Sequence, residues 1–87
     1  MDKLILQKIE EKIQEIIRNK NQLKQLSESF SNLDNSNSFM LGMAVGRLYN
    51  SFFYQTKRLK NREPTEIDFE EFLKLIETRK TDLENLW

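Results

Sequence analysis

The chain is short, carries no formal net charge and contains neither histidine nor cysteine. Its 87 residues fit one domain, residues 1–87, and 38% hydrophobic with 32% charged residues suit a folded chain. Histidine is the commonest general base, and thiolates are common metal ligands. Since a glycine-rich phosphate loop and a calcium-binding loop are absent too, we expect no enzyme activity, no metal and no cofactor.

The first residues carry mixed charges rather than a targeting signal. Asp2, Glu10 and Glu11 are untypical of both signal and transit peptides, so we expect a cytoplasmic protein. The most apolar stretch contains Arg47 and Asn50 and is shorter than the roughly 20 residues of a membrane span. We therefore expect no membrane insertion.

The segment 3–32 has the apolar spacing of a coiled-coil helix. Its apolar residues recur in steps of three and four, which is the pattern of a helical seam. Lys20 and Ser27 interrupt this pattern, and such polar residues either define the register of packing or mark where a helix leaves a bundle. The expected seam consists of Leu6, Ile9, Ile13, Ile16, Leu23 and Phe30.

Residues 34–38 form a polar connection to a second helix, predicted over 39–61. Its Asp, Asn and Ser side chains compete for backbone hydrogen bonds, and Ser36 or Ser38 is the expected N-cap. Residues 39–54 are apolar around most of the helix circumference. Such a helix is covered from more than one side, so we expect it to be the central one.

The third helix, predicted over 66–85, has the clearest start signal. Thr65 can cap its first turn, and Asp68 stands where a capping-box acid returns a bond to the cap. Arg79 interrupts the apolar seam that follows. This seam is made of Phe69, Phe72, Ile76, Leu83 and Leu86.

Short connections between three long helices favour antiparallel neighbours. The predicted fold is therefore all-α, an up-down-up three-helix bundle with long coiled-coil-like helices. A bundle this slender leaves much of the helix at 39–61 exposed. We expect the protein to form a homo-oligomer, most simply a two-fold dimer that uses this helix.

Two glycines four residues apart, Gly42 and Gly46, lie on one face of the second helix. Each costs an isolated helix up to about 1 kcal/mol relative to alanine, so close packing should offset them. This packing is either within the chain, which we favour, or between two copies. Tyr49 and Phe53 continue the same sector, where we expect them to pack in the core with Phe52. The predicted helix-packing or dimer interface is Gly42, Gly46, Tyr49 and Phe53.

A second predicted surface lies towards the polar side of the same helix. Methionine and tyrosine beside an arginine make an adaptable contact surface for a protein partner. The predicted partner contact patch consists of Met40, Met43, Arg47, Asn50 and Tyr54.

Charge is unevenly distributed, and a basic run ends the second helix. Residues 34–62 carry five basic side chains and one acidic, whereas residues 63–87 carry three basic and eight acidic. Basic residues complement the dipole of a helix C-terminus, and the acidic residues that follow would repel a nucleic acid. The candidate phosphate contacts are Lys57, Arg58, Lys60 and Arg62.

Two functions are consistent with these features. We expect a small, non-enzymatic protein-interaction module, an adaptor or regulatory subunit. The alternative is a dimeric nucleic-acid-binding regulator that uses the basic end of the second helix. The two hypotheses differ in how salt affects binding, because the affinity for nucleic acid falls steeply with added salt when phosphates are contacted.

Overall fold

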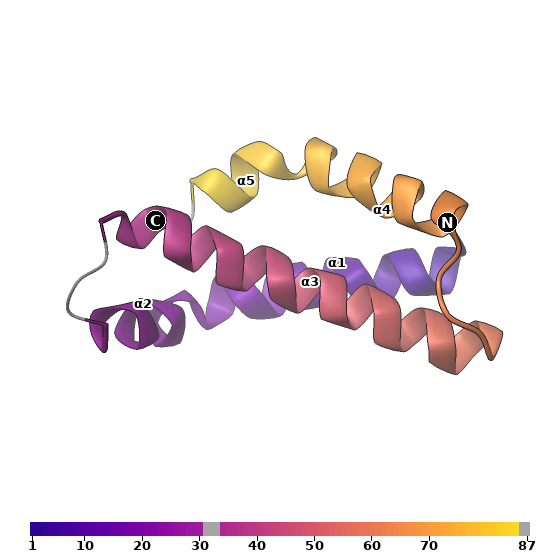
Figure 1. Cartoon of the computed structure of the whole chain (residues 1–87), viewed down its shortest axis with the longest axis horizontal. Helices are drawn as coiled ribbons and strands as arrows, with labels where there is room; N and C mark the ends of the chain where they lie inside the picture. The colour runs from indigo at the N-terminus through magenta and orange to yellow at the C-terminus, as the bar shows by residue number, and fades with distance from the viewer. Residues whose placement is uncertain (31–33, 86–87) are drawn as a thin grey trace.

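A computed structural model describes residues 1–30 and 34–85 of the chain. Within these ranges the protein is all-helical, as predicted, and measures 41 × 22 × 22 Å (Figure 1). The five helices of this part of the chain are α1 (Lys3–Arg18), α2 (Lys20–Glu28), α3 (Ser36–Lys60), α4 (Glu66–Thr78) and α5 (Lys80–Glu84). The last two residues predicted for the first helix, 31–32, and the seam residue Leu86 lie outside the described residues.

Two of the three predicted helices are interrupted at a single residue. Asn19, with φ −105° and ψ 19°, separates α1 from α2, and Arg79, with φ −104° and ψ 6°, separates α4 from α5. Both residues adjoin or occupy a polar interruption of a predicted seam, Lys20 in one case and Arg79 in the other. These interruptions therefore coincide with breaks in the helix, whereas Ser27 is buried within α2 and donates a hydrogen bond to the carbonyl of Lys24 at 2.7 Å.

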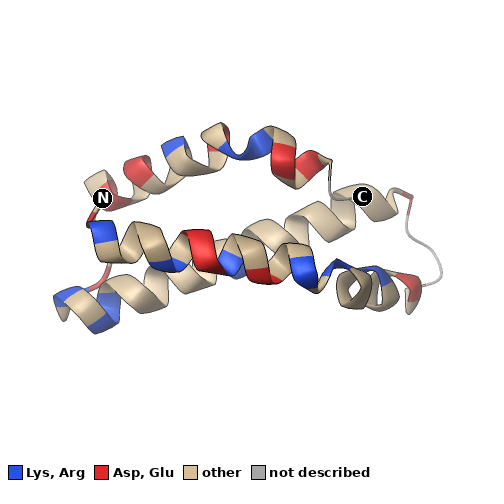
Figure 2. Ribbon diagram, turned by 180° about the vertical axis from the view of Figure 1, so that it is seen from behind, with Lys and Arg blue, Asp and Glu red and all other residues tan. Residues whose placement is uncertain are grey.

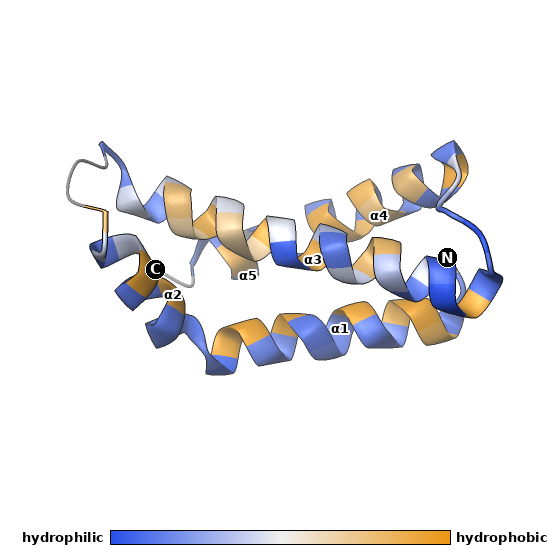
Figure 3. Ribbon diagram, turned by 60° about the horizontal axis from the view of Figure 1, so that its bottom comes forward, coloured by the Kyte–Doolittle hydropathy of each residue, from blue (hydrophilic) through white to orange (hydrophobic). Residues whose placement is uncertain are grey.

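The core lies where α1 and α2 meet α3, and α4 and α5 close it from a third side (Figure 1). The buried face of α1 includes Ile5, at 3% exposure, whereas the predicted seam residue Leu6 is 37% exposed. Phe30, also predicted in the seam, is 55% exposed and lies against the ring of Phe39 at 5.3 Å. Figure 3 shows the apolar and polar sides of α1 alternating along the ribbon. The core cluster is Ile5, Ile9, Ile13, Ile16, Leu23, Ala44, Leu48, Phe52, Phe72 and Leu83.

Side-chain caps define where the helices begin. The Asn35 side chain accepts a hydrogen bond from the backbone of Ser38 at 3.0 Å, so α3 begins three residues before the predicted start and its cap is neither Ser36 nor Ser38. The predicted capping box of α4 is confirmed, with the Thr65 backbone donating to Asp68 at 2.9 Å and the Asp68 backbone donating to Thr65 at 3.2 Å.

The capping box and a neighbouring arginine also change the acidity of Asp68. The backbone N–H of Thr65 and then the guanidinium of Arg62 lower the pKa of the Asp68 carboxyl from 3.8 to about 2. Both donors favour the charged carboxylate. The connection between α3 and α4 is therefore held by charge-assisted hydrogen bonds.

Candidate interaction surface

One face of α3 points away from the rest of the described chain. Ala44, Leu48 and Phe52 face the core, and the two glycines lie on the opposite side of the helix, where both are exposed. A β-carbon added to either glycine would meet nothing within 4 Å. We call this surface the glycine face, made of the exposed residues Gly42, Gly46, Tyr49 and Asn50 with the half-buried Phe39 and Phe53 at its edges.

This geometry corrects the favoured role of the glycine pair. Close packing of Gly42 and Gly46 against another helix of the same chain was expected, but the first helix packs on the opposite side of α3. The cost of two glycines in a helix interior is thus not offset by contacts within residues 1–30 and 34–85. Packing of the two glycines against a second copy of the chain is the alternative that is consistent with this open space.

The glycine face carries no charged side chain. Between Ser36 and Thr56 the only charged residue is Arg47, which reaches sideways to α1 and donates to Glu15 at 3.0 Å. The ribbon of α3 is accordingly almost free of colour between its ends in Figure 2, whereas charges are spread along α1. Helix surfaces that face water normally carry charged residues, so an uncharged outward face is the kind of surface that a protein partner covers.

Aromatic rings extend this surface from α3 onto α4. The ring of Tyr49 lies 6.3 Å from that of Phe53 and 6.1 Å from that of Phe69 on α4. Tyr49 was expected in the core but is 44% exposed, while Phe53 is half-buried. Phe69 and Leu73, at 37% and 47% exposure, continue the apolar area beside the glycine face. Rigid rings of this kind supply contact area at low entropic cost.

The exposure of α4 was not foreseen from the sequence. Phe69, a residue of the predicted seam, is 37% exposed, and Ile67 in the first turn is 68% exposed. A signal was present, because apolar residues occupy more of the circumference of α4 than one neighbouring surface can cover. Only Phe72 of this helix is fully buried, and its ring stacks on Phe52 at 4.7 Å.

The predicted partner contact patch is only partly exposed. Met40 is 4% exposed and lies in the interior, so its assignment to a contact surface is wrong. Met43 is half-buried and packs against the core. Arg47 is paired with Glu15, whose pKa is lowered first by Lys12 and then by this arginine. The reason is the position of α1, which covers the flank of α3 that carries these residues.

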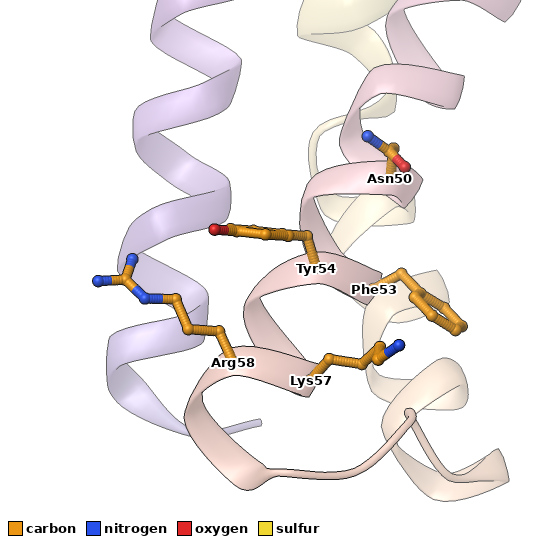
Figure 4. A pocket seen from close by; sticks show the side chains of 5 residues that line it. All are labelled: Asn50, Phe53, Tyr54, Lys57 and Arg58. Carbon is orange, nitrogen blue, oxygen red and sulfur yellow. The ribbon is translucent and has the colours of Figure 1, made fainter.

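The exposed remainder of the patch belongs to a shallow hollow near the C-terminal end of α3. Tyr54 is 60% exposed, and its ring extends beside Arg58 on one flank of the helix, while Phe53 and Lys57 lie on the other (Figure 4). Asn50 completes the lining. The hollow combines an apolar floor with amide, phenol and cationic groups, which suits contact with polar and acidic side chains of a protein.

Of the four candidate phosphate contacts, two form ion pairs within the described residues and two do not. Lys60 lies 3.2 Å from Asp2, and Arg62 lies 2.7 Å from Asp68. The backbone N–H of Leu4 and then Lys60 lower the pKa of the Asp2 carboxyl. Lys57 and Arg58 form no ion pair with the described residues.

Comparison of the chain with protein-family models, with curated proteins and with solved structures finds no match. Residues 1–30 and 34–85 contain no group of three or more acidic side chains arranged to hold a metal ion. None of the helices in these ranges combines the length and apolarity that a bilayer crossing requires.

Proposed function

We propose that this chain is a non-catalytic protein-interaction module that works as a homodimer, with the glycine face of α3 as its interface. In this proposal each copy is an up-down-up bundle of three units: α1 with α2, then α3, then α4 with α5. The observation that carries the proposal is an exposed helix surface without charge, with open space at both Gly42 and Gly46. Exposed apolar faces of this kind mark protein interaction sites.

The chemistry of the face favours a second copy as its partner. Two glycines allow the backbone of another helix to approach closely, and closely approaching helices need small residues at the crossing point. Tyr49 and Phe53 then supply the side chains that fill the space on either side of the crossing. A surface that offers both the groove and the side chains that fill it can pair with itself, as a two-fold interface requires.

Nucleic-acid binding remains the second candidate function. Lys57 and Arg58, with Tyr54 beside them, support it, since all three are exposed. Lys60 and Arg62 are already paired with carboxylates, and an exposed pair of cations supplies few phosphate contacts. We therefore expect no binding to a short DNA duplex at low ionic strength, measured by fluorescence anisotropy.

Sedimentation equilibrium tests the dimer. We expect wild-type protein to change from monomer to dimer over concentrations on the order of 10 µM to 1 mM. In Gly46→Leu a bulky side chain stands at the crossing point and should weaken the dimer at least about tenfold, without unfolding, because leucine is the better helix former. Gln14→Leu, which adds a leucine on the exposed side of α1, is the matched control and should dimerise like wild type. Monomeric wild-type protein at millimolar concentration would refute the proposal.

A further inference from the structure

The residues of the glycine face are spaced symmetrically along the helix about Gly46. Gly42 and Asn50 lie four positions to either side of it, and Phe39 and Phe53 lie seven positions to either side. In two antiparallel helices related by a two-fold axis at Gly46, positions equally distant from the axis face each other. Such a dimer places Asn50 over Gly42 and Phe53 over Phe39, so each large side chain of the pair has a matching small or apolar neighbour.

The position of Tyr49 agrees with the same arrangement. Its counterpart across the axis is Met43, which is half-buried and flanks Gly42. The Tyr49 ring of one copy can therefore lie over the open space at Gly42 of the other, where a β-carbon would meet nothing within 4 Å. In a parallel dimer Tyr49 would face its own copy, and the open space at Gly42 would face the same open space of the partner.

Opposite charges lie near the two ends of α3, since basic residues occupy its last turn and Asp34 precedes its first residue, Ser36. Lys57, near the C-terminal end, lies eleven residues or about 16 Å beyond Gly46, and Asp34 precedes Gly46 by a similar distance. Asp34 is exposed and Glu84 of α5 lines a hollow with Asn35, at the same end of α3. Lys80 lies 4.0 Å from Glu84, the outer limit of an ion pair, while neither Lys57 nor Asp34 is paired within the described residues. Antiparallel packing brings these opposite charges together twice, whereas parallel packing places the two Lys57 side chains side by side.

We propose that two copies of this chain pack antiparallel through their glycine faces, with the two-fold axis at Gly46, so that Lys57 of each copy faces Asp34 and Glu84 of the other. This inference rests on the proposed homodimer and adds its orientation and register. It also gives the unpaired Lys57 a partner of defined chemistry.

The absence of cysteine from the chain allows disulfide bonds to report this register. A disulfide needs Cα atoms within about 7 Å, and in an antiparallel dimer the two copies of residue 42, or of residue 50, are separated by roughly 12 Å along the helices. Gly46→Cys should therefore form a covalent dimer alone. Gly42→Cys and Asn50→Cys should form no covalent dimer when each is oxidised alone, and should form a mixed disulfide only when the two variants are combined. Gln14→Cys, exposed on α1, measures random oxidation under the same conditions.

The outcomes separate the two proposals. Disulfides in all three single variants would establish parallel packing. A dimer that forms no disulfide at any of these positions would place the interface elsewhere. Either result would overturn the antiparallel register but would leave the proposed self-association standing. A monomeric wild-type protein refutes the proposed homodimer itself.

Charge reversal tests the ends of the interface independently. Lys57→Glu should raise the dimer dissociation constant by roughly tenfold at low ionic strength, because two symmetry-related pairs are lost. Adding Asp34→Lys and Glu84→Lys to the same chain should restore most of the affinity, and salt should diminish both effects. Equal weakening by the single and the triple variant would contradict the pairing of Lys57 with these acids.

Discussion

Replacing both glycines of α3 with alanine should stabilise the monomer. Each Gly→Ala change in a helix interior is worth about 0.8–1.0 kcal/mol, since alanine loses less conformational freedom on folding. The steric term that usually opposes this gain is absent, because a β-carbon at Gly42 or Gly46 meets nothing within 4 Å. The double variant should therefore gain about 2 kcal/mol in free energy of unfolding.

Chemical and thermal denaturation measure this gain when the protein is dilute enough to be monomeric. For a domain of this size, 1 kcal/mol shifts the midpoint temperature by about 4–8 °C, so the double variant should unfold well above wild type. Gln14→Ala on the exposed side of α1 is the control and should change the free energy of unfolding by only a few tenths of a kcal/mol. A double variant destabilised by about 1 kcal/mol or more would show that the glycines are packed within the chain and would refute the reasoning.

Two further predictions concern the core and the start of α4. Leu48→Ala removes a side chain that is 0% exposed and should cost about 2–5 kcal/mol of unfolding free energy by denaturation, whereas Leu26→Ala, at 53% exposure, should cost less than about 0.5 kcal/mol. Equal losses would contradict the described core. The pKa of Asp68 is lowered from 3.8 to about 2 in the folded protein, so its carboxylate contributes stability above pH 3.8 that is lost as pH falls towards 2. Because the Asp68 side chain is still 25% exposed and its ion pair is screened by solvent, the contribution should not exceed about 1 kcal/mol. Asp68→Asn should remove that part of the pH dependence in acid titrations of stability.

The features that could be read from the sequence are those that depend on neighbours along the chain. The capping box of Thr65 and Asp68 involves residues three apart, so a single helical turn contains all of its partners. The spacing of Ile9, Ile13 and Ile16 likewise predicts a helix with one apolar face, and all three are buried. The all-helical fold follows from such local patterns.

The direction in which a face points depends on distant residues. Gly42 and Gly46 share a helix with Met40, and their spacing alone does not reveal which of them faces α1. Packing against α1 and α2 turned Met40 inwards and left both glycines open, the reverse of the prediction. For the same reason Ile5 rather than Leu6 entered the core, because a small rotation of α1 decides between adjacent residues.

What the sequence by itself determined is the helical content, the capping box of α4 and the uncharged character of residues 36–46, since propensity, hydrogen bonding within a turn and residue type are local properties. The tertiary structure alone decided that this uncharged face lies outwards. Burial is shared among all the helices, and once α1, α2, α4 and α5 occupy the other sides of α3, the side with the two glycines is the one that remains for a partner.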